Sequence, residues 1–185
     1  MLQRVINIRA GGSVQRCHTN PHIGSYNNAA HQWGVAMLLW ELWPEDFPRL
    51  AVYCLTHDTP ERWTGDSPAT LKWYAPEVRA GLKPVEDLVF DSLRLPRESS
   101  LSEDDAQKLK NCDSLELYLW CLEQRKMGNR EIEEICCSLE EFFVEKPLLA
   151  EAQILYDQIR TWGDYTFPQR LRELIPVERD SDISK

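Results

Sequence analysis

The residues of this sequence best suited to chemistry lie together in the stretch LTHDTPERWTGD, residues 55–66. His57 stands next to Asp58, Glu61 follows three residues later, and Asp66 ends the stretch. If the segment is helical, His57, Asp58 and Glu61 can converge on one side, because residues three and four apart are neighbours on a helix. Imidazole and carboxylate together suit Zn, Mn, Fe, Co or Ni. The stretch therefore indicates a metal ion in a cleft; the alternative is a surface histidine in a solvated charge cluster.

Two other residues of the stretch shape its backbone. Pro60 cannot donate a hydrogen bond to the Thr56 carbonyl inside a helix and tends to kink the axis. Gly65 suits the end of a helix, where a positive φ is often needed. We therefore expect a helix that bends at Pro60 and stops at Gly65.

Two residues elsewhere are candidates for the same metal. His31 lies near the start of the predicted helix NAAHQWGVAMLLW, where the helix dipole disfavours the imidazolium and keeps a ligand neutral. Asp113 lies inside a strongly apolar helical segment, where a carboxylate is costly unless it is paired, hydrogen-bonded or bound to a cation. The alternatives are a hydrogen-bonded core histidine for His31 and an ion pair with Lys110 for Asp113. Two histidines and two aspartates from three helices would form one open metal site.

The elements that must position these residues are all predicted to be helices, because no segment shows sustained alternation of period two. Glycine, proline and capping residues predict helices over residues 1–10, 28–43, 45–63, 75–93, 102–127, 130–162 and 167–175. Asn27 or Asn28 is the expected N-cap of the second helix, and Ser102 that of the long helix. We expect an all-α, compact helical bundle with a single domain over residues 1–176 and a flexible C-terminal tail over 177–185.

Composition narrows the possible partners and the compartment. The net charge of −9 over 185 residues disfavours nucleic acid, since that binding depends on neutralising phosphates with Lys and Arg. The longest apolar-rich run, VAMLLWELW, is far shorter than a membrane span, and the N-terminus shows no secretory signal. The six cysteines have no CxxC spacing and read as reduced thiols. We therefore expect a cytoplasmic protein without a membrane or nucleic-acid partner.

The order His31, His57-Asp58, Asp113 resembles the H…HD…D signature of the HD-domain metal-dependent phosphohydrolases. The fuller pattern HDxxExxxxD over residues 57–66, with LKxxD ending at Asp113, resembles the branch that acts on deoxynucleotides. That branch includes small bacterial 5'-deoxynucleotidases and phage dATP triphosphohydrolases. The resemblance covers about residues 1–125 and implies an HD-domain bundle, located in the host cytoplasm if the protein is phage-encoded.

The resemblance implies a metal and two catalytic carboxyls. The two histidines and two aspartates of the signature would bind a divalent transition metal (Co, Zn or Mn), and a second divalent ion could accompany a triphosphate. Glu61 would be the acid/base that activates or orients the attacking water. Asp66 matches the position that contacts the 3'-hydroxyl of deoxyribose. The partner implied is a small-molecule deoxynucleotide.

The resemblance also implies a phosphate path and a base-binding loop. Arg16 matches an arginine that binds phosphate, and Lys72 and Lys110 match lysines along the phosphate path of the triphosphohydrolases. The deoxynucleotidases commonly have tryptophan directly after this arginine, whereas this chain has Cys17. We place His18, Thr19 and Ile23 near the base, with plain loop packing as the alternative.

Several functions fit this pattern. The first is hydrolysis of a deoxynucleoside triphosphate, preferentially dATP, to deoxynucleoside and inorganic triphosphate, because three cations exceed the need of a monophosphate. The alternative is a 5'-deoxynucleotidase that releases phosphate from deoxynucleoside monophosphates. A non-catalytic nucleotide-binding HD module, or an acidic helical scaffold, is disfavoured because every ligand and Glu61 are present. A homo-oligomer, dimer or hexamer, is expected from the family.

Overall fold

The computed structural model describes residues 1–68 and 75–161 of the chain. Every regular element within them is helical, which confirms the predicted all-α class. The helices are α1 (Leu2–Gly11), α2 (Asn28–Leu42), α3 (Phe47–Cys54), α4 (Glu61–Thr64), α6 (Pro76–Leu93), the 3-10 turn η1 (Glu98–Ser100), α7 (Glu103–Lys126), α8 (Glu133–Glu145) and α9 (Ala150–Arg160). The predicted helix 167–175 and the predicted tail 177–185 lie outside the described residues.

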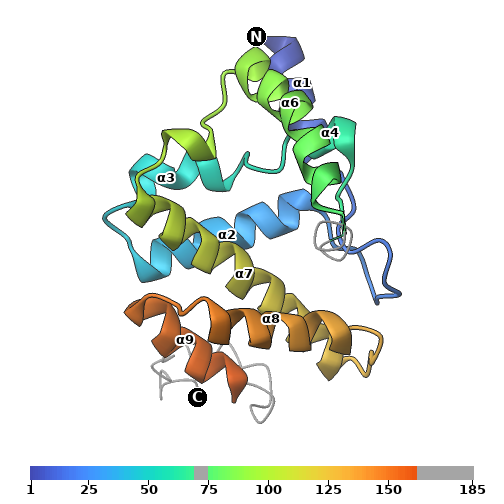
Figure 1. Cartoon of the computed structure of the whole chain (residues 1–185), viewed down its shortest axis with the longest axis vertical. Helices are drawn as coiled ribbons and strands as arrows, with labels where there is room; N and C mark the ends of the chain where they lie inside the picture. Colours follow the sequence, from blue (N-terminus) through green and yellow to red (C-terminus); the bar gives the residue numbers. More distant parts are fainter. Residues whose placement is uncertain (69–74, 162–185) are drawn as a thin grey trace, which may run out of the picture.

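Helices α2 and α7 form the centre of the bundle and cross its middle side by side (Figure 1). Helix α3 packs on α2, and α8 and α9 pack on α7. Their apolar faces share one large core, in which Val35 and Leu39 of α2 and Leu115 of α7 are almost completely buried. No helix of the described part of the chain has the length and apolar character needed to cross a membrane.

A second, smaller core lies at the other end of the molecule. There α1, α4 and α6 gather near the N-terminus (Figure 1). Val89, Leu93 and Leu95 are buried together, and Ile8 of α1 packs against them. Helix α4 contacts both α1 and α6. The two helices at the centre of the bundle and the short helix α4 are therefore supported by different apolar clusters.

The predicted helix starts are confirmed where capping side chains were recognised. The Asn27 side chain accepts a hydrogen bond from the N–H of Ala30 at 3.0 Å, so Asn27 is the N-cap of α2. The Ser102 hydroxyl accepts one from the N–H of Asp105 at 3.1 Å at the start of α7. These bonds satisfy N–H groups that the first turn of a helix leaves unpaired.

Two predicted helices are in fact interrupted. The helix expected over residues 45–63 ends at Cys54, and residues 55–60 form successive turns before α4 begins after Pro60. The proline does more than kink the helix, because it lacks an N–H and its ring crowds the preceding turn. The helix expected over 130–162 likewise stops at Glu145 and restarts at Ala150, on either side of Pro147.

The turns at residues 55–60 are packed tightly against the end of α1. A Cβ on Gly11 would lie 2.9 Å from both the Cα and the carbonyl oxygen of Thr59, which is closer than real Cβ contacts allow. Thr59 itself is only 1% exposed. Gly11 therefore permits a backbone approach that fixes the segment carrying His57 and Asp58.

An ion pair joins α3 to the start of α7. The Arg49 guanidinium donates to both carboxylate oxygens of Asp105, at 2.5 and 2.8 Å. This hydrogen bonding lowers the pKa of Asp105 to about 2. The bidentate geometry, rather than the charge alone, distinguishes it from an ordinary surface pair.

We expect Asp105→Asn to be less stable than the wild type at pH 7, and the difference to disappear in acid. Because the pKa of Asp105 is lower in the folded state, its stabilisation is present above the unfolded pKa of about 4 and is lost as pH falls toward 2. Urea unfolding followed by circular dichroism between pH 7 and pH 2 measures this. Glu103→Gln, exposed two residues earlier, is the control. Equal midpoints for Asp105→Asn and wild type at pH 7 would contradict the prediction.

Candidate metal centre

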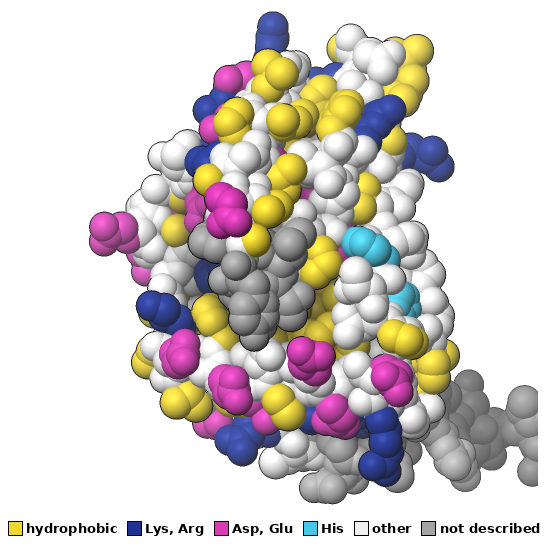
Figure 2. All heavy atoms as spheres, turned by 45° about the vertical axis from the view of Figure 1, so that its right-hand side comes forward, with side chains coloured by type: hydrophobic (Ala, Val, Ile, Leu, Met, Phe, Trp, Pro, Cys, Tyr) yellow, Lys and Arg dark blue, Asp and Glu magenta, His cyan; other side chains and the backbone are white. Residues whose placement is uncertain are grey.

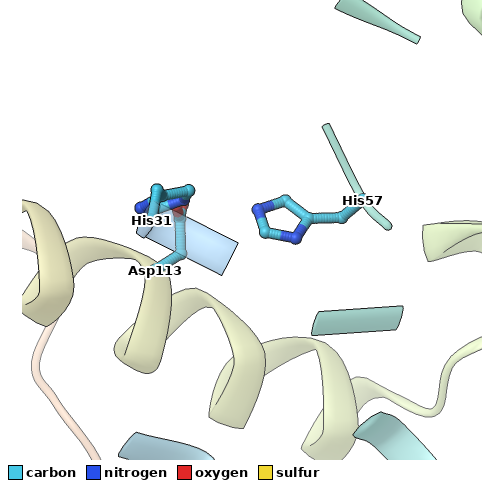
Figure 3. A group of neighbouring side chains, drawn as sticks. All are labelled: His31, His57 and Asp113. Atoms are coloured by element: carbon cyan, nitrogen blue, oxygen red, sulfur yellow. The ribbon is translucent and has the colours of Figure 1, made fainter. Parts of the chain in front are cut away.

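Three of the predicted metal ligands converge in the structure. One ligand atom from each of His31, His57 and Asp113 lies within 4.8 Å of the others. Figure 3 shows the His57 ring directed toward His31 and Asp113, which lie beside each other. His31 comes from α2, Asp113 from α7 and His57 from the turn after α3. Three separate elements therefore bring these groups to one point.

Asp58, the fourth predicted ligand, borders the same point. Its Oδ2 lies 3.3 Å from Nε2 of His57 and 3.7 Å from Nε2 of His31. The same oxygen accepts a hydrogen bond from Nη1 of Arg16 at 2.5 Å. His57 and Asp58 reach the site from a turn, so the regular helix assumed for them is unnecessary.

The hydrogen bonds of the two imidazoles leave the same ring nitrogen facing the site. Nδ1 of His57 lies 2.9 Å from the Cys54 carbonyl, and Nδ1 of His31 lies against a carboxylate oxygen of Glu116. These acceptors require a proton on Nδ1, which leaves the lone pair on Nε2. Both Nε2 atoms are buried and make no hydrogen bond among the described residues, although Oδ1 of Asp113 lies 3.1 Å from that of His31 and Oδ2 of Asp58 lies 3.3 Å from that of His57. Such a pair of imidazoles beside carboxylates fits a divalent transition metal.

Glu116 was missed by the sequence analysis. Its Oε2 accepts hydrogen bonds from Nδ1 of His31 and, at 2.5 Å, from the Tyr26 hydroxyl. A signal was available, since Glu116 is a second carboxylate in the apolar helix of Asp113, three residues further on. Residues at that spacing share a helix face. Like Asp113, Glu116 is a carboxylate in an apolar helix, which is costly unless it is paired, hydrogen-bonded or bound to a cation.

The charges around His31 determine its pKa. Burial and the charge of Arg16 lower its pKa, but the adjacent carboxylates of Asp113 and Glu116 outweigh them and raise it to about 9. The neighbouring carboxylates thus oppose the effect expected from the start of α2, which disfavours the imidazolium. For Asp113, burial opposes ionisation, yet the charge of Lys110 and the contact with His31 hold the pKa well below its usual value.

Glu61 lies beside the cluster in a position suited to proton transfer. Its Oε2 accepts a hydrogen bond from the Asn28 side chain at 2.8 Å. Burial, followed by the negative charge of Asp58, raises the pKa of Glu61 to about 8. A carboxyl with a pKa near neutrality can both accept and return a proton. Asn28, fully buried and also hydrogen-bonded to Arg16 at 3.2 Å, was recognised only as a possible helix cap.

The loop after α1 brings Arg16 and its neighbours to Asp66. The N–H of Cys17 donates to Oδ2 of Asp66 at 2.9 Å, and Nδ1 of His18 lies 3.9 Å from the same oxygen. Cys17 has a φ of +51°, a conformation that residues other than glycine adopt rarely and that is enriched at functional sites. His18 is about half exposed, and Figure 2 shows histidine side chains at the surface above a row of acidic side chains.

Comparison with known proteins settles the family. Residues 12–160 match the family described as 5'-deoxynucleotidase YfbR-like. The chain belongs to the YfbR-like family. The predicted resemblance to the deoxynucleotide branch of the HD-domain phosphohydrolases is thereby confirmed.

Two YfbR-like relatives illustrate how far the sequence match extends. A 5'-deoxynucleotidase of Vibrio vulnificus is 36% identical over 96 residues, which is 45% of this chain and 50% of the relative. One of Photobacterium profundum is 33% identical over 105 residues, 50% of this chain and 54% of the relative. The matched region thus spans about half the length of the curated relatives.

Two solved structures share this fold over most of the chain. The PH0347 protein of Pyrococcus horikoshii OT3 superposes with a TM-score of 0.65 at 18% identity, covering 89% of this chain and 99% of that one. The HD phosphohydrolase DatZ of cyanophage S-2L, bound to dA and one catalytic zinc ion, gives a TM-score of 0.62 at 20% identity. It covers 87% of this chain and 96% of the other. At these identities the likeness establishes the fold.

The other substrate-binding residues predicted for this YfbR-like chain are Lys110, Ile23 and Lys72, and the two that the structure describes differ in position relative to the cluster. Lys110 donates to Oδ2 of Asp113 at 2.8 Å, so the predicted ion pair exists alongside the contact of Asp113 with His31. Ile23 is held through its backbone N–H and carbonyl by Gln124, at 2.8 and 2.9 Å. Gln124 is eleven residues beyond Asp113, roughly 16 Å along α7. Lys72 lies outside the described residues.

Proposed function

We propose that the protein is a metal-dependent 5'-deoxynucleotidase, which releases orthophosphate from deoxynucleoside monophosphates. The observation that carries the proposal is the convergence of His31, His57 and Asp113 on one point, with unpartnered imidazole nitrogens facing it. The YfbR-like family and its 5'-deoxynucleotidase relatives supply the substrate class. The bound zinc of DatZ is an example of a metal ion in this fold.

The metal would be held by His31, His57, Asp58 and Asp113. A divalent transition metal, Zn, Co or Mn, makes a bound water more acidic and stabilises negative charge on a phosphate oxygen. Asp58 is prepared for this role because, although burial opposes ionisation, the charges of His57 and Arg16 keep its pKa low. Asp58 and Asp113 are thus ionised near neutral pH.

Arg16 is suited to bind the phosphate. Its Nη1 is occupied by Asp58 and Asn28, whereas its buried Nε has no hydrogen-bond partner among the described residues. A buried donor without an acceptor is costly, and a phosphate oxygen would satisfy it with a charge-assisted hydrogen bond. The guanidinium therefore couples the substrate to a metal ligand.

Glu61 would act at the phosphate ester bond, and Asp66 would bind the sugar of the same nucleotide. Glu61 can take the proton of the attacking water and return it to the leaving 5'-oxygen, since its pKa lies near neutrality. Asp66, oriented by the Cys17 N–H, would accept a hydrogen bond from the 3'-hydroxyl of deoxyribose. His18 would face the base from the same loop. The dimer or hexamer implied by the resemblance stays a prediction.

The triphosphate reaction preferred from the sequence is less well supported. That preference depended on three cations, Arg16, Lys72 and Lys110. Arg16 and Lys110 each pair with a carboxylate of the site, so their charges are largely offset before substrate binds. The relatives also carry the 5'-deoxynucleotidase name. Both points favour one phosphate over three.

A panel of substrates tests the proposal directly. The purified protein, loaded with Co²⁺, Mn²⁺ or Zn²⁺, is incubated with deoxy- and ribonucleoside mono-, di- and triphosphates, and the products are resolved as phosphate, pyrophosphate or triphosphate. We expect orthophosphate from deoxynucleoside monophosphates and at least tenfold lower kcat/KM for the ribonucleotides. Inorganic triphosphate from dATP, with inert monophosphates, would instead establish the triphosphohydrolase reaction. The absence of hydrolysis with all of these metals would refute the proposal that the protein is a nucleotide hydrolase.

A further inference from the structure

We propose that Glu116 is a positioning residue for the metal centre, and that Gly34 is glycine because Glu116 must pass it. Glu116 would fix the His31 ring and its tautomer, so that Nε2 presents its lone pair to the metal. The inference deepens the proposed function and depends on it, because it requires that a metal binds here. No contact of Glu116 with the substrate is implied.

The first support is the hydrogen-bond chain behind His31. The carboxylate of Glu116 lies between Nδ1 of His31 and the Tyr26 hydroxyl, which is 2.5 Å from Oε2. His31 is completely buried and Tyr26 is 2% exposed, so neither group has water as a substitute partner. An acceptor fixed on Nδ1 selects the tautomer with a free Nε2 and makes that nitrogen a stronger ligand.

The second support is the rigidity of this chain. The Tyr26 ring stacks on Trp120, with centroids 4.4 Å apart and planes at 11°. Its hydroxyl therefore reaches Glu116 from a fixed ring, and the carboxylate cannot rotate without losing a buried hydrogen bond. Glu116 on α7, the helix that also carries Asp113, thereby fixes the His31 ring through Nδ1, the nitrogen that faces away from the proposed metal.

The third support is independent of hydrogen bonding. Gly34 lies inside α2, one turn after His31, where glycine is an unfavourable helix residue. A Cβ at this position would lie 2.6 Å from Cγ and 3.0 Å from Oε1 of Glu116. Any other residue would displace Glu116 from the space it crosses to reach His31. The presence of glycine at position 34 is thus explained by the same contact between Glu116 and His31.

A positioning role and a simple packing role for Glu116 predict different effects of its removal. If Glu116 only filled space or satisfied Tyr26, its removal would change stability but leave the metal affinity of the folded protein unchanged. If Glu116 orients His31, its removal lowers the metal affinity even of correctly folded protein. Metal affinity of folded protein is therefore the deciding measurement.

The test measures Co²⁺ affinity by competition with a chromophoric chelator, together with the visible absorption of the bound Co²⁺. We expect Glu116→Ala to bind Co²⁺ about 10–100-fold more weakly than the wild type, with an altered spectrum. Glu116→Gln keeps an acceptor for Nδ1 and should recover part of the loss. Glu123→Ala, an exposed glutamate on the same helix, is the matched control and should bind like the wild type. Circular dichroism confirms that each variant is folded.

Gly34→Ala provides a test that leaves every hydrogen-bonding group in place. It should weaken Co²⁺ binding in the same direction as Glu116→Ala, although alanine favours the helix. In the double variant Gly34→Ala/Glu116→Ala the two losses of Co²⁺ affinity should not add. The glutamate side chain that the alanine at position 34 would displace is already absent there. Additive losses would show that Gly34 acts by another route and would overturn its part of the inference.

The outcomes separate the inference from the proposed function. A wild-type protein that binds no Co²⁺ refutes the metal centre and, with it, the proposed function. Wild-type binding with unchanged affinity in folded Glu116→Ala overturns the positioning role alone. Should Glu116→Ala fail to fold, Gly34→Ala and Tyr26→Phe decide, since each perturbs Glu116 without removing it; wild-type affinity in both would overturn the role.

Discussion

Replacement of Glu61 by glutamine is expected to lower kcat for deoxynucleoside monophosphates by about 10²–10⁴-fold while metal content stays at the wild-type level. Glutamine has the shape of glutamate and can still accept the hydrogen bond from Asn28, but it cannot take a proton. The carboxyl is set up for that task, because burial and Asp58 raise its pKa to about 8. The loss should therefore appear in turnover, with little change in KM.

The measurement pairs steady-state kinetics with metal analysis of the same samples. Glu131→Gln, an exposed glutamate outside the site, should behave as wild type in both. A Glu61→Gln enzyme with wild-type kcat would remove this residue from the proton transfer. Loss of metal together with activity would instead make Glu61 a ligand or a structural support.

Asp58→Asn and Asp113→Asn are each expected to weaken metal binding strongly and to lose activity with it. A neutral amide cannot replace the charge of a carboxylate ligand, and loss of a ligand should exceed the 10–100-fold cost typical of an outer partner. We therefore expect metal affinity to fall by more than about 100-fold. Asp58→Asn also removes the charge that Arg16 pairs with, so phosphate binding should weaken as well.

Metal content after dialysis, and activity with Co²⁺ added back, measure this effect. The matched control is Asp104→Asn, whose side chain is 64% exposed on the same helix as Asp113. Full metal content in Asp58→Asn would exclude that residue from the ligands. Activity restored by high Co²⁺ would show a weakened site rather than an abolished one.

Much of the centre could be predicted because its information is local. The spacing of His57, Asp58 and Glu61 places them within one short segment, whatever its backbone form. Helix caps such as Asn27 and Ser102 are also local signals, since the cap and its N–H partner are three residues apart. A bend was expected at Pro60, but the earlier end of α3 at Cys54 was not. The break at Pro147 was missed because the apolar residues Leu148 and Leu149 follow it directly.

The residues that contact the proposed ligands from outside the site could not be predicted in the same way. Glu116 contacts His31 across 85 residues and Tyr26 across 90. No period or motif links such positions; only the packing of α2 on α7 does. Asn28 and Gly34 carry similarly ambiguous signals, since asparagine at a helix start and glycine inside a helix have common local explanations.

The two apolar clusters have a consequence for the order in which parts of the proposed site unfold. His31 and Asp113 are anchored in the large core, whereas Glu61 sits on α4, which packs with α1 and α6 around the small one. Clusters of such unequal size differ in the free energy of local opening. Mild denaturant or heat should therefore detach α1, α4 and α6 first. That would release the segment of His57 and Asp58, which packs on Gly11 of α1, together with Glu61, while His31 and Asp113 stay in the folded large core.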